Sequence, residues 1–214
     1  KFTGQVFGVL IVEDLFAVVL LVLFQVGWPF RAGIADRLIG AVAGVLSILC
    51  ARTSLASQLF YPAYEGGRLA DDGRLVMYQL VRWAACFAIL LIAATIIAFG
   101  RQMVRAERSH LIRALSHCMT GAVVSVSAAG WCFVPDLIDM GSASPDNGLL
   151  TRFIIVAAAF VVVAVLFAVC SVSWSREADP DPAAPAPWLG IGLLPVMLSG
   201  LLVFAASFVM QLIF

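Results

Sequence analysis

Charged side chains are scarce in this sequence. They make up 12% of its 214 residues, whereas 63% of the residues are hydrophobic. Because soluble domains carry roughly a quarter charged residues and about half apolar ones, this composition excludes a water-soluble globular domain and indicates a protein integral to a lipid bilayer. Acidic and basic residues balance at 13 each, and no basic block stands on a soluble domain. We therefore expect no nucleic-acid partner.

Motifs of soluble enzymes are absent as well. The sequence has no Gly-rich phosphate loop, no HExxH, no GxSxG and no Ser/His/Asp set on a soluble domain. Histidine occurs only at His110 and His117, which are seven residues apart and so share one face of one helix. Haem or metal ligation across a bundle needs ligands on facing helices, which makes this pair a poor site. We expect no enzyme activity, no metal and no cofactor.

Cysteine is present without any pairing pattern. The five cysteines are scattered within or beside apolar segments, and none belongs to a CxxC pair. An odd, dispersed set of this kind favours reduced cysteines that act as small hydrophobic side chains over a disulfide framework or a metal site. The five are Cys50, Cys86, Cys118, Cys132 and Cys170.

Long apolar segments dominate the rest of the sequence. A bilayer core needs about 20 consecutive apolar residues in a helix, and six segments of roughly that kind can be drawn. We predict an all-α, polytopic integral membrane protein with about six transmembrane helices, in which residues 1–214 form a single transmembrane helical domain. The segments cover residues 5–26, 34–51, 81–100, 114–134, 152–173 and 188–214.

The second segment is the weakest of the six. Its uncharged run extends only from Leu38 to Ala51, and Asp36 and Arg37 stand at its start. A run of this length is short for a bilayer core. The segment is therefore either a short, tilted span or one arm of a re-entrant hairpin.

Two long connections separate the segments. Residues 52–80 combine aromatic residues and Pro with Gly and Asp turn formers, which is typical of a loop lying on the membrane surface. Residues 175–187 form a Pro-rich loop, for which an extended polyproline conformation is favoured over a helix. Trp28 and Trp83 stand at the ends of apolar segments, so we predict that they mark the membrane–water boundary.

Arginine is concentrated in one connection. Four arginines lie close together where the third segment leads into the fourth, and this density favours the cytoplasmic side. Two interpretations remain open, a docking patch for anionic lipid or an acidic partner and a collar that only follows the positive-inside tendency. On this orientation both termini lie outside, and we expect the membrane to be a bacterial inner (plasma) membrane. The four are Arg101, Arg105, Arg108 and Arg113.

Small residues mark the segments expected to pack inside the protein. The fourth segment, residues 114–134, is rich in Ser and Gly and includes Gly121 and Ser125. Small side chains let helix backbones approach closely in lipid, so this helix should be surrounded by protein. Gly40 and Gly44 give the second segment a small-xxx-small spacing, and we predict that they also lie in an interhelical contact.

Two adjacent carboxylates interrupt the first segment near its middle. Glu13 and Asp14 stand in an apolar run, where an ionised carboxylate costs about 2.5–3.5 kcal/mol by insertion scales. Neighbouring helix positions point about 100° apart, so one carboxylate can face a partner helix while the other faces a cavity. At least one of them is expected to stay protonated. Either they carry a proton or a cation, or they fix helix register in an assembly.

The same stretch resembles the helix of a known family. Residues 8–23, GVLIVEDLFAVVLLVL, are similar to the ion-binding helix of monovalent cation:proton antiporters. Those proteins place an acidic pair, or Asn-Asp or Gln-Asp, before Leu in such a helix. The resemblance implies that Asp14 matches the transporting Asp and that Glu13 matches the variable residue before it.

Two functions are compatible with these patterns. The first is a non-catalytic integral membrane subunit of a larger complex, of the secretion, conjugation or energy-transducing type, with other membrane protein subunits as partners. The alternative is a small proton- or cation-coupled transporter that uses Asp14 and Glu13. No other segment offers a deeply buried Lys or Arg for these carboxylates, so their partner should be water, a proton or another chain. We favour the subunit, because a carrier without a charged partner on another helix is incomplete.

Overall fold

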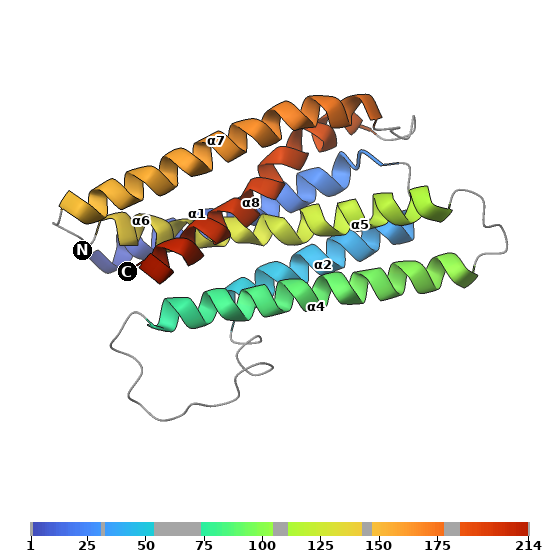
Figure 1. Ribbon diagram of the computed structural model, residues 1–214. Coiled ribbons are helices and arrows are strands. Elements are labelled where there is room, and N and C mark those ends of the chain that lie inside the picture. The colour runs from blue at the N-terminus through green and yellow to red at the C-terminus, as the bar shows by residue number, and fades with distance from the viewer. Residues whose placement is uncertain are drawn as a thin grey trace.

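The chain folds as a bundle of helices. The computed structural model describes residues 2–30, 33–53, 74–104, 111–142, 147–177 and 185–213. Regular structure in these ranges is helical and includes no strand, which confirms the predicted all-α class. The elements drawn in Figure 1 are α1 (Phe2–Val26), α2 (Ile34–Arg52), α4 (Arg74–Val104), α5 (Leu111–Ser127), the 3₁₀ helix η1 (Ala128–Phe133), α6 (Val134–Ser142), α7 (Asn147–Glu177) and α8 (Pro187–Ile213).

Several of these helices are able to cross a bilayer. Shorter apolar stretches lie in α1 and α7, and α2 is one continuous helix of 19 residues, which favours a short span over a re-entrant arm. The predicted polytopic membrane class is confirmed. Within the described residues, 4 stretches are long and apolar enough to span a bilayer: Ile34–Arg52, Gln79–Val104, Ile112–Ile138 and Pro187–Leu212.

The helices run side by side along one long direction (Figure 1). α2 packs against α4 and α5, while α8 packs against η1 and α7. α7 lies at the outside of the bundle, and many of its apolar side chains are exposed, among them Ile155, Val162 and Val169. Because lipid tails are as apolar as these side chains, α7 is suited to direct contact with hydrocarbon.

The fourth predicted span changes its helical geometry along its length. α5, η1 and α6 follow one another without a loop, and η1 tightens the chain into a 3₁₀ helix. Most residues from Gly121 to Phe133 are buried, so the middle of this span is surrounded by protein, as predicted, whereas most described residues before Gly121 and after Phe133 are exposed or half-buried. At Gly130 its backbone touches α8 directly, since a Cβ there would lie 2.0 Å from the Gly200 carbonyl oxygen. Only glycine permits so close an approach of two backbones.

Trp28 and Trp83 were predicted to mark the membrane–water boundary, and their rings lie inside the bundle, where they face protein. Trp28 is 2% exposed and Trp83 is 0% exposed. The Trp83 ring packs against Phe133 and Phe204, with centroids 5.5 and 4.6 Å away, and its Nε1 donates to Ser47 Oγ at 3.1 Å. A buried ring contributes a large apolar area, and an internal acceptor removes the need for an aqueous one.

Both connections are shorter in the structure than predicted, because the flanking helices extend into their ends. Arg52 still belongs to α2 and α4 begins at Arg74, so the predicted loop 52–80 loses both of its ends to helices. Similarly, α7 and α8 take the first and last residues of the predicted loop 175–187. The middle parts of both connections lie outside the described residues. The boundaries were misplaced because helical hydrogen bonding continues past an apolar run into the polar residues that follow it.

Candidate intramembrane ion-pair site

Asp14 of α1 forms an ion pair with Arg52 of α2. The Arg52 Nε donates to Asp14 Oδ1. Asp14 lies at the midpoint of α1, whereas Arg52 stands in the last turn of α2. The expectation that no other segment offers Asp14 a basic partner was therefore wrong. It failed because Arg52 was assigned to a connection, although the helix includes it and its long side chain reaches the carboxylate from there.

Cys132 of η1 lies beside this ion pair. Its thiol is within interaction range of both the Arg52 guanidinium and the Asp14 carboxylate, and the residue is 2% exposed. The preceding residue, Trp131, donates its Nε1–H to the Val196 carbonyl of α8 at 2.9 Å. The ion pair therefore lies where α1 and α2 meet the 3₁₀ element, which is itself held against α8.

Serine side chains of neighbouring helices hydrogen-bond the backbone on either side of η1. Ser47 Oγ of α2 donates to the Val126 carbonyl at 3.0 Å, and Ser207 Oγ of α8 donates to the Phe133 carbonyl at 3.3 Å. Irregular helical backbone is tolerated at membrane depth where neighbouring helices and hydroxyl groups satisfy its polar atoms. The two serines thus stabilise the 3₁₀ geometry next to the ion pair.

A second ion pair joins the other end of α2 to α4. Arg101 Nη1 donates to Asp36 Oδ1 at 2.5 Å. Asp36 Oδ2 also accepts from the Gly33 N–H at 3.3 Å, so the carboxylate caps the first turn of α2, where negative charge is favoured. Arg101 belongs to the arginine cluster that was interpreted either as a docking patch for anionic lipid or an acidic partner, or as a collar that follows the positive-inside tendency. Its guanidinium is engaged by Asp36, and its side chain stays 33% exposed.

The two ion pairs differ in how completely the protein covers them. The Asp36 side chain is 2% exposed, whereas the Asp14 side chain is 41% exposed. Their arginine partners are intermediate, at 33% for Arg101 and 20% for Arg52. The Asp14 carboxylate is therefore partly exposed, whereas the Asp36 carboxylate is buried.

The remaining residues of the two predicted charged sites are described only in part. Glu13 belongs to α1, next to Asp14, but its side chain lies outside the described ones. Arg105 and Arg108 lie outside the described residues altogether. Arg113 stands in the first turn of α5 and is exposed. Of the predicted arginine cluster, the structure thus places Arg113 and the paired Arg101, and it does not describe the patch as a whole.

Two of the glycines predicted to pack between helices lie against Trp28. A Cβ at Gly121 would lie 2.2 Å from Trp28 Cη2, and a Cβ at Gly40 would lie 3.3 Å from the same atom. Gly40 is in α2 and Gly121 is in α5, so the two helices together leave a slot for the indole ring. The absence of side chains at both positions is what admits Trp28 to the interior.

The other two predicted packing residues lie one turn further along the same helices. A Cβ at Gly44 would lie 2.7 Å from Leu21 Cδ1 of α1 and 3.0 Å from the Ser125 carbonyl oxygen of α5. Ser125 is fully buried, and its Oγ accepts from Gln25 Nε2 at 3.4 Å. α1, α2 and α5 therefore approach one another closely around these positions.

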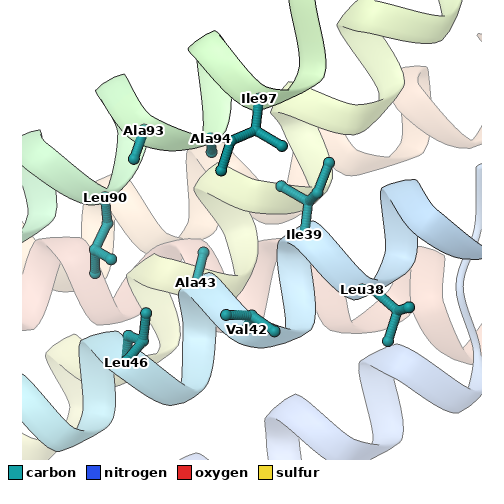
Figure 2. Close-up of a pocket in the computed structure, with 9 residues that line it drawn as sticks. All are labelled: Leu38, Ile39, Val42, Ala43, Leu46, Leu90, Ala93, Ala94 and Ile97. Atoms are coloured by element: carbon teal, nitrogen blue, oxygen red, sulfur yellow. The ribbon is translucent and has the colours of Figure 1, made fainter. Parts of the chain in front are cut away.

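A groove runs between α2 and α4. Its volume is about 250 Å³, and Figure 2 shows that its lining side chains come from these two helices alone. The lining includes no charged or polar residue, so the groove suits hydrocarbon and offers no path for an ion. The residues are Leu38, Ile39, Val42, Ala43, Leu46, Leu90, Ala93, Ala94 and Ile97.

Comparison with known proteins yields no relative. No protein-family model, no curated protein and no solved structure matches this chain. The likeness of residues 8–23 to the ion-binding helix of antiporters accordingly stays a prediction.

Three residues of the site were not assigned a role from the sequence. Asp36 and Arg52 did carry a signal, because they stand in the first and last turns of one apolar helix with the signs that its macrodipole favours. Cys132 carried none. Its place beside Asp14 results from the packing of η1 between α1 and α8, which depends on contacts far apart in the chain.

Proposed function

We propose that this protein is a proton- or cation-coupled membrane transporter, or forms part of one, with Asp14 as the carrier group. The observation that carries the proposal is the ion pair between Asp14 and Arg52. An ionisable residue inside a membrane span is by default a candidate for an ion or proton pathway, with its partner named. Here the partner is the Arg52 guanidinium on another helix. The expected lack of such a partner was the main argument against a carrier.

The two members of the pair respond differently to a proton. An arginine stays charged at any pH that a cell meets, whereas a carboxylate either holds a proton or carries a negative charge. Binding of a proton or a monovalent cation to Asp14 would cancel the charge that Arg52 faces, and release would restore it. Each event would change the attraction between α1 and α2, so ion binding has a mechanical consequence in this arrangement.

The irregular backbone beside the pair supports the same function. Transport sites are commonly built at interrupted helices, and a 3₁₀ stretch within a helix often marks a hinge. η1 is such a stretch, and its Cys132 lies against both charges. Glu13 precedes Asp14 in α1 and would tune the carrier group.

Flux measurements in proteoliposomes test this proposal. The reconstituted protein should show a pH-dependent proton or cation flux, and Asp14→Asn should abolish it because an amide does not ionise. Asp14→Glu keeps a carboxylate and should retain part of the flux. Asp36→Asn is the matched control, since it removes the carboxylate of the other ion pair, and flux per folded molecule should persist. Unchanged flux in Asp14→Asn at equal incorporation would contradict the proposal.

A second function, a non-catalytic subunit of a larger membrane complex, is favoured by a different observation. The Asp14 side chain is 41% exposed although it lies at the middle of an apolar helix, so the described bundle leaves one charge partly uncovered. A further protein component would cover it. Extraction in a mild detergent followed by sizing tests this function. A larger assembly is expected, and a monodisperse isolated monomer would contradict it.

A further inference from the structure

From Leu15 to Val26, one side of α1 is apolar and is not covered by the other described helices. Five of its exposed side chains recur at positions i, i+3, i+4, i+7 and i+11, which places them in one stripe along the helix. The opposite side of α1 is buried by α2, η1 and α8. We call these five positions the α1 stripe; they are Leu15, Val18, Val19, Val22 and Val26, exposed by 58%, 41%, 43%, 55% and 47%, and the exposed Phe16 and Leu23 lie beside them.

Asp14 lies at the edge of the α1 stripe. Viewed down the axis of α1, Asp14 lies between the directions of buried Leu21 and exposed Val18. Its side chain is 41% exposed. If lipid covered the stripe, part of the carboxylate would face hydrocarbon, which offers no hydrogen-bond donor. Asp36, the carboxylate of the other pair, is 2% exposed and meets no such penalty. The protein seals one acid and leaves the other open.

We propose that a transmembrane helix of a different polypeptide covers the α1 stripe and donates a hydrogen bond to Asp14. This inference rests on the second proposed function, that the chain works in a larger assembly, and it names the surface and the chemistry of the partner. The partner presents an apolar face to the valines and one donor side chain, such as Ser, Thr, Asn or Gln, at the depth of Asp14. Such interhelical donors are a recurrent means of association in lipid.

A second copy of this chain is a poorer occupant of the stripe. A symmetric dimer uses the same patch on both subunits, so a two-fold axis at this face would bring the two Asp14 carboxylates toward each other. Like charges at short range in a low-dielectric environment are unfavourable. A different helix that carries a donor has no such conflict.

α7 provides an internal comparison. Val165 of α7 is 55% exposed, the same fraction as Val22 of α1. Both are valines on apolar helices, but the described exposed side chains around Val165 are apolar, such as Val161 and Val169, and bring no charge to that surface. Lipid is therefore a sufficient cover for α7 and not for α1.

Site-specific photo-crosslinking in native membranes tests the proposal. A benzoylphenylalanine in place of Val22 should yield an adduct with another polypeptide, and one in place of Val165 should yield lipid adducts only. The masses of the adducts distinguish the outcomes. Lipid adducts alone from both positions would overturn the proposal, and so would a Val22 adduct whose mass is that of two copies of this chain.

The role of Asp14 in this contact has its own readout. With the crosslinker at Val22, Asp14→Leu should lower the yield of the polypeptide adduct by about threefold, the effect of losing one interhelical hydrogen bond. Asp14→Asn keeps an acceptor and should restore the yield. Equal yields in all three backgrounds would overturn the hydrogen bond to Asp14. Lipid adducts alone at Val22, together with a large assembly in sizing, would reject the α1 stripe as the contact surface but keep the proposal that the chain works in an assembly. Intact flux would keep the transport proposal in either case.

Discussion

Arg52 in the last turn of α2 is paired with Asp14 at the midpoint of α1, while Asp36 in the first turn of α2 is paired with Arg101 of α4. At 1.5 Å per residue, the two paired positions of α2 lie roughly 24 Å apart along its axis. α2 is thus tied at both ends, to a different helix at each. This arrangement fixes both ends of α2, which at 19 residues is the shortest described helix that is long and apolar enough to span.

The first prediction concerns the coupling within the Asp14–Arg52 pair. Asp14→Ala or Arg52→Ala alone leaves one charge without its partner inside the membrane, which costs about 2.5–3.5 kcal/mol by insertion scales. The double variant removes both charges and should be more stable than the sum of the single effects. Thermal unfolding in lipid nanodiscs measures each variant. Additive losses would show that the two side chains do not interact.

The sequence was sufficient to predict the helices and to single out Asp14, but it was not sufficient to predict its partner. Apolar runs and their ends are local properties of the chain, so α1, α2, α7 and α8 lie close to where they were expected. The contact with Arg52 depends on which helices become neighbours and how far one is shifted along the other. No local pattern contains that information.

The second prediction concerns the slot that holds Trp28. Gly121→Ala places a methyl group where the indole ring lies, because the Cβ would be 2.2 Å from Trp28 Cη2. Overpacking of this kind costs about 1–3 kcal/mol, so Tm should fall. Gly192→Ala is the matched control: no atom lies within 4 Å of a Cβ there, and alanine improves helix propensity by up to about 1 kcal/mol. Equal effects of the two substitutions would contradict the slot.

Trp28 also shows what a local sequence pattern leaves open about a tryptophan. A tryptophan beside a proline at the end of an apolar run is typical of the membrane interface. Whether the ring turns inward depends on the space that other helices leave for it. Here Gly40 and Gly121 leave that space from two different helices. Each glycine was predicted to allow close helix packing, and the structure shows the side chain that fills the resulting room.

The third prediction concerns Ser47, which hydrogen-bonds two partners at once. Its Oγ accepts from Trp83 Nε1 at 3.1 Å and donates to the Val126 carbonyl at 3.0 Å. Ser47→Ala leaves the buried indole N–H without this acceptor, at a cost of about 1–3 kcal/mol. Trp83→Phe removes that donor. It should therefore destabilise the protein less in the Ser47→Ala background than in the wild type. Unfolding midpoints of the four proteins measure this, and equal costs in both backgrounds would show no coupling.

The fourth prediction uses cysteines as reporters of the two ion pairs. All five cysteines are free, Cys170 is exposed, and Cys118 and Cys132 are 0% and 2% exposed. An organomercurial applied to the protein in detergent should therefore modify Cys170 first, and Cys170→Ser should remove that fast reaction. Mass spectrometry counts the adducts at each time. Rapid reaction of Cys132 in the unaltered protein would mean that the junction around it is open.

Each ion pair lies beside one of the buried thiols, which makes the reporters selective. Cys132 is within interaction range of Asp14 and Arg52, and Cys118 is within range of Asp36 and Arg101. Arg52→Ala removes the side chain beside Cys132 and should speed its modification while Cys118 stays slow. Asp36→Ala should have the opposite selectivity. Simultaneous acceleration of both thiols by either substitution would mean that the whole bundle loosens, so crossed selectivity is the outcome that separates two local junctions from general unfolding.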